Sequence, residues 1–285
     1  MSERTSKTLC LADLARSSGE WLRGDGPESD IVISSRVRLA RNVAGFPFVT
    51  RASADARNQI VHAVLAAIHS GVRDRTIYDI NVETLSALDG QLLTERQLIS
   101  RELARGDGAR AVAVSEGERY SVMINEEDHL RIQVLHSGYS LDECWKEATT
   151  LDDQIEAGVP FAFHPEFGYL TACPTNVGTG IRVSVMVHLP ALRITREIQK
   201  VHQAAQKINL AVRGLYGEGS QAMGDFYQIS NQVTLGKSEQ QLIENVQEVV
   251  SHIVKWERRV RDLLIRDNKS QLHDQIARAF GTLTR

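Results

Sequence analysis

Hydrophobic and polar positions alternate along several short stretches of the chain, a pattern typical of β-strands that bury one face. In the clearest stretch, 129–135, the apolar residues Leu130, Ile132 and Val134 fall on one face and polar residues on the other. A polar turn at 125–128 separates it from the apolar run at 120–124, which predicts a β-hairpin with an acidic tip. Further strands are predicted at 31–37, 111–114, 181–187, 210–212 and 226–234.

Other stretches carry apolar residues at helical spacing, and residues 53–70 give the clearest amphipathic pattern. Two further helices are predicted to begin at Ser140 and Ser238, each with the spacing of a capping box, completed by Glu143 and Gln241 respectively. The remaining predicted helices cover 94–104 and 190–208. Hairpins with helices between them predict an α+β fold, in which an antiparallel sheet is flanked by helices.

The same pattern divides the 285 residues into three parts. Residues 1–29 are polar and form a predicted N-terminal tail with one short helix around 11–21. Residues 30–265 contain the predicted strands and most helices, so they form one folded domain. Residues 266–285 are predicted to be a C-terminal helical tail.

Composition narrows the possible partners and the compartment. The formal net charge is −3, so we expect no nucleic-acid partner. The longest apolar runs, such as 63–68, are too short to span a bilayer, and the N-terminus lacks the apolar core of a signal peptide. Three scattered cysteines suit a reducing compartment and show no zinc spacing. We therefore expect a cytoplasmic protein with no membrane partner and no structural metal.

The usual nucleotide-binding and hydrolase motifs are absent from the sequence, among them GxxxxGK[ST], GxGxxG, HExxH and GxSxG. Any nucleotide site must therefore be built in another way. Arginines instead occupy the polar faces or the ends of predicted strands: Arg36, Arg38, Arg131, Arg182 and Arg213. Each alone is explained as a solvent-exposed residue or ion-pair partner. Together they indicate a cage for phosphates, because a guanidinium binds phosphate oxygens with two nitrogens and stays charged.

Carboxylates and one cysteine lie in the turns between these strands. The acidic tip 126–128 is either a solvated turn or a grip for a cationic substrate. A guanidinium substrate needs such a grip, because its nitrogen must be oriented and must lose a proton before it attacks phosphorus. Glu218 lies in a glycine-rich stretch that is able to close over a substrate and exclude water. Cys173 is either a buried small side chain or a thiolate that orients a guanidinium.

Four segments together resemble the catalytic domain of the phosphagen (guanidino) kinases, and the resemblance covers about residues 28–265. The chain is most similar to the bacterial protein arginine kinases within that superfamily, with supporting stretches at 26–32, 168–171 and 228–236. The four segments are Ser34-Ser35-Arg36-Val37-Arg38, Asn125-Glu126-Glu127-Asp128-His129-Leu130-Arg131, Cys173-Pro174-Thr175-Asn176-Val177-Gly178-Thr179-Gly180 and Arg213-Gly214-Leu215-Tyr216-Gly217-Glu218.

The resemblance implies a glutamine-synthetase-like catalytic fold and roles for individual residues. ATP enters with Mg²⁺, which is held mainly by phosphates and water. Glu127 and Glu218 hold the guanidinium, Glu127 is the better candidate for the base, and Cys173 lines the guanidino pocket. The implied ATP-binding residues are Ser34, Ser35, Arg36, Val37, Arg38, Gln97, Arg131, Arg182, Val183, Ser184, Val185, Met186, Arg213, Gly214, Leu215, Tyr216 and Gly217.

The expected reaction is direct in-line transfer of the γ-phosphoryl group of ATP to a guanidino nitrogen of arginine side chains in proteins. Only about thirty residues precede Ser34, where small-molecule phosphagen kinases carry a helical domain, so we expect a pocket open to protein substrates. The chain departs from the family pattern in two ways. It has Gln97 where the family usually has histidine, and it lacks the usual C-terminal domain. The alternatives are a free-guanidino kinase and an inactive ATP-binding adaptor. The resemblance also implies a Clp-type protease system, an activator protein and stress-response repressors as partners.

Overall fold

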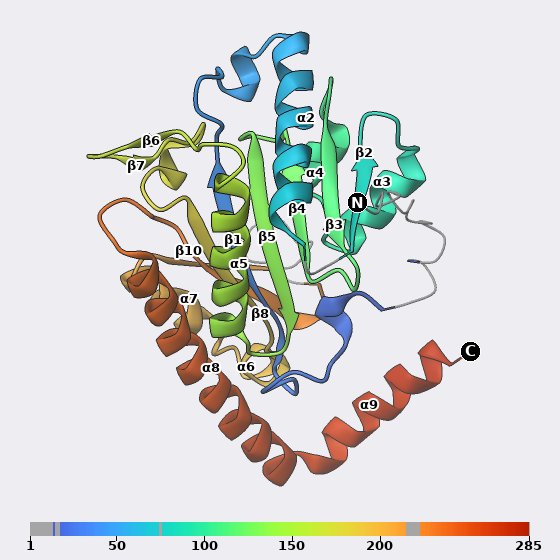
Figure 1. The fold of residues 1–285 in the computed structure, drawn as a ribbon. Helices are drawn as coiled ribbons and strands as arrows, with labels where there is room; N and C mark the ends of the chain where they lie inside the picture. Colours follow the sequence, from blue (N-terminus) through green and yellow to red (C-terminus); the bar gives the residue numbers. More distant parts are fainter. Residues whose placement is uncertain (1–13, 15–17, 74–75, 215–222, 285) are drawn as a thin grey trace.

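The structure is a computed structural model that describes residues 14, 18–73, 76–214 and 223–284. Its centre is an eight-stranded sheet with the order β2-β3-β4-β5-β1-β8-β10-β9, in which every neighbouring pair is antiparallel (Figure 1). This confirms the predicted antiparallel sheet. The strands are β1 (Val32–Arg41), β2 (Ile77–Asn81), β3 (Ala111–Ser115), β4 (Tyr120–Ile124), β5 (Leu130–Ser137), β8 (Ile181–His188), β9 (Leu210–Gly214) and β10 (Phe226–Asn231).

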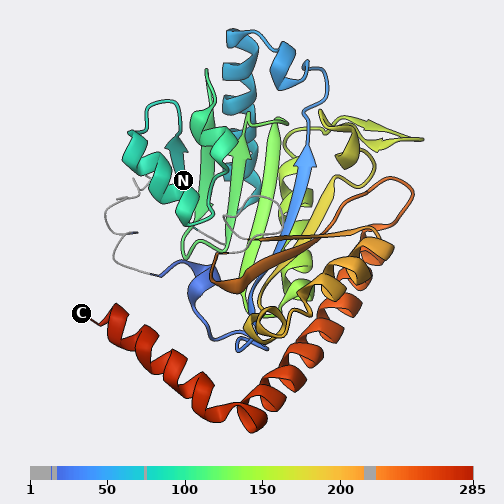
Figure 2. The ribbon, with the colours of Figure 1, turned by 180° about the vertical axis from the view of Figure 1, so that it is seen from behind.

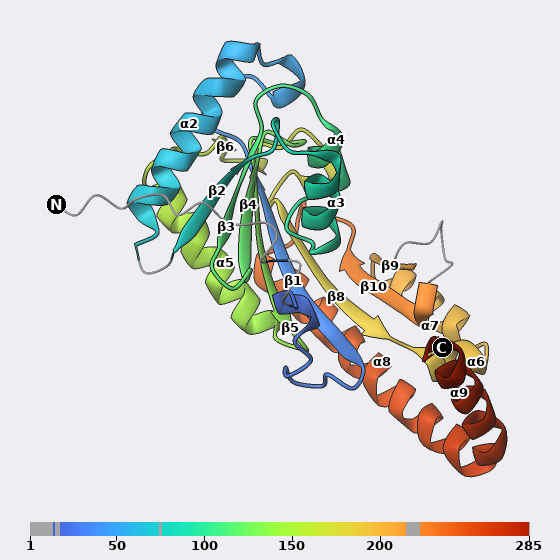
Figure 3. The same cartoon turned by 90° about the vertical axis from the view of Figure 1, so that its right-hand side faces the viewer.

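Helices cover one face of the sheet along its whole length and the other face only in part (Figure 3). The main core lies under α2 (Ala54–Gly71), α5 (Leu141–Glu156) and α8 (Glu239–Asp267), together with α6 (Pro190–Ile194) and α7 (Ile198–Lys207). A second, smaller core lies on the opposite face, where α3 (Ala87–Glu95) and α4 (Arg101–Arg105) cover β2, β3 and β4. The rest of that opposite face, over β5, β1, β8 and β10, carries polar side chains.

Strand alternation explains this division of the two faces. In β1, Val37 and Leu39 belong to the main core, so Arg36 and Arg38 point to the opposite face. The same rule places Arg182 and Ser184 of β8 on the polar face, since the valines beside them lie in the core. The apolar faces predicted from the sequence are therefore confirmed, and they direct the arginines to one surface.

Two of the predicted helices are interrupted. The stretch 94–104 was predicted as one helix, but α3 ends before Gln97, whose φ of 60° lies in the left-handed region, and α4 begins after Ser100. The predicted helix 190–208 is likewise divided into α6 and α7, with Arg196 at φ 61° between them. A residue at positive φ cannot continue a right-handed helix, and non-glycine residues give little sign of it in sequence.

The two predicted capping boxes differ in outcome. The box of Ser238 and Gln241 forms at the start of α8 and is confirmed. The prediction of a capping box at Ser140 and Glu143 is wrong, because the Ser140 hydroxyl donates to Ser137 O instead of capping α5. Strand β2 was not predicted from the sequence.

Several short elements complete the described chain. The hairpin β6 (Phe163–His164) and β7 (Gly168–Tyr169) forms a separate two-stranded sheet at the edge of the molecule (Figure 2). The helix predicted around 11–21 lies mostly outside the described residues. The 3-10 helices are η1 (Glu20–Leu22), η2 (Val49–Arg51), η3 (Pro174–Asn176) and η4 (Met223–Asp225).

Helix α9 (Lys269–Leu283) follows α8 and extends away from the sheet, and none of its residues is buried (Figures 1 and 3). The division of the chain into a tail, a catalytic domain and a second tail stays a prediction. Within the described ranges, every helix is too short or too polar to cross a membrane.

Candidate active site

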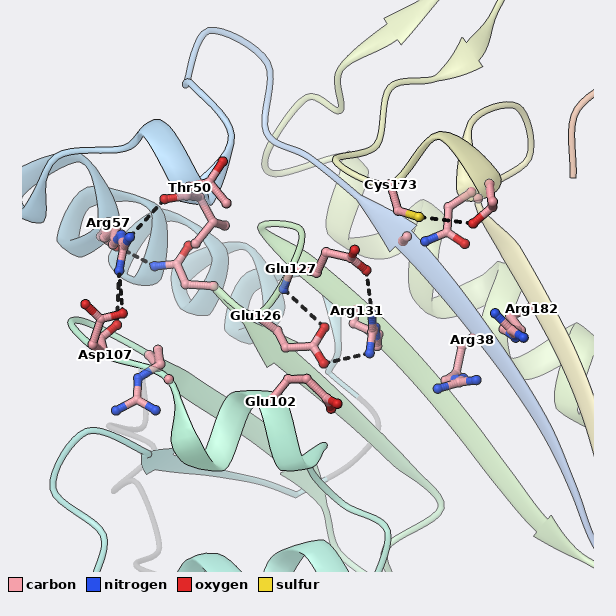
Figure 4. A pocket seen from close by; sticks show the side chains of 18 of the residues that line it. Arg38, Thr50, Arg57, Glu102, Asp107, Glu126, Glu127, Arg131, Cys173 and Arg182 are labelled. Carbon is pink, nitrogen blue, oxygen red and sulfur yellow. Dashed lines mark hydrogen bonds and ion pairs between the residues drawn. The ribbon is translucent and has the colours of Figure 1, made fainter. Parts of the chain in front are cut away.

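A cavity of about 700 Å³ runs across the polar face of the sheet (Figure 4). At one end it is lined by Arg213 of β9 and Gln228 of β10, which face each other in register. Arg182, Arg38 and Arg131 line its middle. The carboxylates of the β4–β5 turn and the thiol of Cys173 follow, and the far end is formed by η2, α2 and the connection between α4 and β3.

In the middle of the cavity, Arg131 is paired with carboxylates, whereas the described residues provide no ion pair for Arg38 or Arg182. Arg38 and Arg182 lie opposite each other on β1 and β8, and the Nε atom of each is buried with no hydrogen-bond partner in the described part of the chain. Burial lowers the pKa of Arg38 well below its usual range, and the positive charges of Arg36, Arg131 and Arg182 lower it further. Burial also lowers the pKa of Arg182. Such a cluster is suited to a polyanion, which would satisfy the donors and relieve the repulsion.

Arg36 is held differently, although the sequence places it with the other arginines. Its Nε donates to Ser184 Oγ at 3.3 Å, Nη1 to Gln97 Oε1 at 3.1 Å, and Nη2 to Gln228 Oε1 at 3.0 Å. Burial lowers its pKa to about 10, and neighbouring arginines contribute. Arg36 is not among the residues that line the cavity. Gln228 was not predicted as a site residue, although its strand position opposite Arg213 places it on the same face.

The acidic turn between β4 and β5 faces the arginines. The Glu126 carboxylate is buried and lies 2.6 Å from Arg131 Nη1, and it also accepts a hydrogen bond from Ser100 at the start of α4. The Glu127 side chain is half exposed and lies 3.3 Å from Arg131 Nη2. Burial raises the pKa of Glu127, while Arg131 opposes this effect. A carboxylate with a raised pKa in a cavity is a suitable proton acceptor.

Cys173 lines the cavity near these carboxylates, with its Sγ atom 3.0 Å from Thr175 Oγ1 (Figure 4). A buried carboxylate fixes its position relative to the acidic turn. Asp128 Oδ1 accepts hydrogen bonds from Ala172 N and from Asn42 Nδ2, both at 2.6 Å. Asn42 also accepts from His129 N at 3.0 Å. The turn that carries Glu127, the loop that carries Cys173 and the end of β1 are therefore tied together at one buried point.

The far end of the cavity contains residues that the sequence did not single out. Arg57 of α2 donates from Nη2 to Val49 O and from Nη1 to Asp107 O, both at 3.0 Å, and so bridges two loops across that end. Glycine and polar residues surround it, without a motif that would have identified them. Glu126 was predicted with the acidic turn, and Asn125, Thr175, Asn176 and Gly180 lie in the segments that carry the family resemblance. The lining residues that were not predicted are Ala40, Val49, Thr50, Arg57, Glu102, Gly106, Asp107, Arg110 and Gln228.

Some predicted nucleotide residues lie away from the cavity. Val37, Val183 and Val185 belong to the main core, so only their backbone is available for the site face. Ser35 is also buried, where its hydroxyl donates to Gly138 O. Ser34, Ser184 and Met186 alternate with these residues and share the face of the arginines, whereas Gly214 ends β9. The predicted residues Leu215, Tyr216, Gly217 and Glu218 lie outside the described residues.

Comparison with protein families places the chain among known enzymes. Residues 57–260 match the model of the ATP:guanido phosphotransferase C-terminal catalytic domain. The chain belongs to this family. The guanido phosphotransferase is 46% identical over 275 residues to a protein-arginine kinase of Moorella thermoacetica, covering 95% of this chain and 78% of that protein. It is 45% identical over 277 residues to a protein-arginine kinase of Halothermothrix orenii, covering 97% and 79% of the two chains.

Solved structures with the same fold are more distant in sequence. The duplicated taurocyamine kinase from Schistosoma mansoni with bound transition-state analogue components gives a TM-score of 0.72 at 23% identity, covering 88% of this chain and 36% of that one. A lombricine kinase gives a TM-score of 0.71 at 22% identity, and the match covers 91% of this chain and 73% of that one. These likenesses confirm the predicted fold of the guanido phosphotransferase.

Proposed function

We propose that this guanido phosphotransferase is a protein-arginine kinase, which transfers the γ-phosphoryl group of ATP to a guanidino nitrogen of arginine side chains in proteins. Relatives with that name are 42% to 46% identical over at least 90% of the chain. The observation that carries the proposal is that one cavity of the described structure brings arginines with unpartnered, buried Nε atoms next to carboxylates. One group of residues suits a polyphosphate and the other suits a guanidinium.

The arginines account for the nucleotide side of the reaction. Arg38 and Arg182 have buried donors without partners in the described structure, and Arg131 and Arg213 line the same cavity. These donors fit the phosphate oxygens of ATP. During transfer, the charge of the γ-phosphoryl group is spread over its three equatorial oxygens, which the arginines are able to bind. Magnesium bound to the phosphates would neutralise part of their charge. The family resemblance implies that Mg²⁺ would be coordinated mainly by these phosphates and by water.

The acidic turn accounts for the acceptor side. A substrate guanidinium that binds between Glu127 and Cys173 would replace Arg131 as the partner of the Glu127 carboxylate. As the guanidino nitrogen bonds to the γ-phosphorus, the bond from phosphorus to the ADP oxygen breaks, and the nitrogen's proton passes to Glu127. The Cys173 sulfur would orient the guanidinium from the opposite side. Glu218, which lies outside the described residues, is proposed as the second carboxylate on the strength of the family resemblance.

The decisive experiment compares a protein acceptor with a small one. The chain is incubated with Mg-ATP and an arginine-rich unfolded protein, or with free arginine, and the products are followed by phosphorus NMR and by mass spectrometry without acid. We expect phosphoarginine on the protein and none with the Glu127→Gln variant. Product only with free arginine would instead identify a small-molecule guanidino kinase. ATP binding without any product would identify an adaptor.

The biological setting is proposed from the family resemblance alone. We propose that phosphorylated proteins pass to a Clp-type protease system, that an activator protein controls the kinase, and that the enzyme acts in the cytoplasm during stress. Co-purification of phosphorylated substrates with such a protease, lost in the Glu127→Gln variant, would support this setting. Equal recovery with the inactive variant would contradict it.

A further inference from the structure

Four half-exposed apolar side chains lie on two segments at one edge of the molecule. Phe163 and Phe167 belong to the β6–β7 hairpin, and Val233 and Leu235 belong to the connection after β10. Between 46% and 58% of each residue is exposed to solvent. We call these four residues the apolar rim. Figures 1 and 2 show the hairpin and the connection side by side in opposite views.

Both segments are attached to the loop that forms a wall of the cavity. Tyr169 N of the hairpin donates to Gly178 O at 2.8 Å. On the other segment, the Thr234 hydroxyl donates to Thr175 O at 3.0 Å and to Val177 O at 2.6 Å. Gly178 lies so close to the second segment that a Cβ atom there would be 3.1 Å from Leu235 Cα. The rim therefore borders the loop 173–180, whose residues Cys173, Thr175 and Asn176 line the cavity.

The hairpin that carries the rim has a rigid support. Phe163 packs edge-on against Tyr169, with ring centroids 5.4 Å apart. The Arg41 guanidinium lies 3.5 Å from the centre of the Tyr169 ring and is paired with Asp152 at 2.8 Å in the protein interior. Phe167 stacks on His164 at 4.9 Å. The Phe163 ring is thus supported from the protein interior through Tyr169, although about half of the residue is exposed to water. Exposed apolar side chains gathered at one place are a feature of surfaces that bind a partner.

We propose that the apolar rim binds apolar side chains of the substrate polypeptide that flank the target arginine. The inference rests on the proposed function and names its substrate class. An arginine whose guanidinium lies between Glu127 and Cys173 brings its own polypeptide to the mouth of the cavity, next to the loop 173–180. Because each extended residue advances the chain by about 3.3–3.6 Å, residues a few positions from the arginine reach the hairpin and the connection. A free guanidino compound has no such residues and leaves the rim unused.

The test uses pairs of short peptides that contain one arginine flanked either by leucine and phenylalanine or by serine. We expect wild-type kcat/KM to be about tenfold higher for the apolar peptide, the size of effect that burying one large apolar side chain gives. The double variant Phe163→Ser/Phe167→Ser removes this preference, and Leu235→Ser reduces it. Activity toward free arginine is measured with the same preparations as an internal reference. Leu88→Ser on α3, where Leu88 is 76% exposed, is the matched control and keeps the preference.

Several results would overturn the proposal. A wild-type enzyme that does not distinguish the two peptides leaves the rim without a role in acceptor binding. An equal loss toward peptide and free arginine in the double variant shows damage to the site instead. A concentration-dependent dimer in sedimentation, abolished by the double variant while the peptide preference persists, would assign the rim to a second copy of the chain.

Failure of the proposed function gives a different pattern. If wild type phosphorylates neither peptide, binding of the fluorescein-labelled apolar peptide is measured by anisotropy in the presence of Mg-ADP. Weaker binding by the double variant than by Leu88→Ser supports the rim even then. Equal binding by the two variants contradicts it.

Discussion

At the scale of single residues, the arginines of the cavity are arranged for a ligand rather than for stability. Arg38 and Arg182 face each other with buried donors that lack partners in the described chain. Burial lowers the pKa of each group, and the positive charges of neighbouring arginines lower it further, so the charged form is costly in the free protein. The binding of an anion removes the cost, so the same residues that weaken the free protein strengthen its complex.

The first prediction follows from this conflict between stability and binding. Replacing Arg182 with Gln is expected to raise the free energy of unfolding of the nucleotide-free protein by about 1 kcal/mol, because one repulsive charge is gone. The same change is expected to weaken ATP binding. Urea unfolding without nucleotide and calorimetric titration with Mg-ATP measure the two effects. A variant that is less stable without ATP would show that the cluster is not under electrostatic strain.

The second prediction concerns the proposed base. Glu127→Gln keeps the side-chain shape but cannot accept the proton, so phosphoryl transfer is expected to fall by roughly 10²–10⁴-fold. ATP binding is expected to persist because the arginines are intact. Rapid-quench measurement of phosphoarginine formation tests the change. Glu95→Gln on the exposed face of α3 is the control, and a similar loss in both variants would remove Glu127 from the mechanism.

The third prediction concerns the dependence of the rate on pH. Burial raises the pKa of Glu127, so its carboxylate becomes protonated at a higher pH than an ordinary glutamate, which titrates at about 4.3. The protonated form cannot accept a proton from the substrate. We therefore expect kcat/KM to fall as the pH is lowered through this raised pKa and to reach a plateau above it. A profile for Glu127→Gln with the same acidic fall would assign the titration to another group.

At the scale of elements, the site depends on how turns and loops are joined. Asp128 connects the β4–β5 turn to the segment before Cys173, and Asn42 at the end of β1 completes the connection. All three segments carry or border the acceptor end of the cavity. The loss of these hydrogen bonds would allow Glu127 and Cys173 to move apart without changing the arginines.

The fourth prediction tests that connection. Asp128→Ala is expected to lower kcat/KM for the arginine acceptor by roughly 100-fold, as small displacements of reacting groups do, with no change in ATP binding. Asp128→Asn is expected to recover most of the activity. Its amide oxygen accepts both hydrogen bonds, and its nitrogen replaces Oδ2, which lacks a partner in the described structure. Equal losses in the two variants would mean that the negative charge, rather than the connection, is required.

The elements also show how far the sequence alone predicts the fold and the site. The alternation of hydrophobic and polar residues correctly predicted most strands and the face on which Arg182 lies, because this pattern depends only on residues close together in the sequence. It could not locate the helix break at Gln97, where a non-glycine residue adopts a positive φ. The contact between Asn42 and Asp128 spans 86 positions and leaves no periodic signal. Roles carried over from the family, such as that of Glu218, stay predictions.

At the scale of the whole molecule, α8 is joined to the start of α6 through a buried carboxylate. The buried face of this helix is apolar except for Glu257, which is completely buried. Its carboxylate accepts from Ala191 N and Leu192 N, each at 3.0 Å, and from Arg261 Nε at 2.8 Å. One side chain of α8 thus satisfies the first backbone donors of α6.

The fifth prediction concerns this contact. Glu257→Ala leaves two buried N–H groups and Arg261 without their acceptor, so the free energy of unfolding is expected to fall by about 3–5 kcal/mol. Glu257→Gln is expected to cost less, since its oxygen still accepts. Urea unfolding followed by tryptophan fluorescence and circular dichroism measures both. An Ala variant as stable as wild type would mean that water replaces the carboxylate.

The position of β1 in the sheet has a consequence for how the protein is made. β1 is an early strand, yet its neighbour β8 comes much later, and the hydrogen-bonded residues Arg36 and Ser184 are 148 positions apart. Contacts of such long sequence separation form slowly and only after both strands have left the ribosome. Until then β1 presents its arginines without the strand that faces them. The cavity of the growing chain is therefore completed late in synthesis, once β8, β9 and β10 have joined β1.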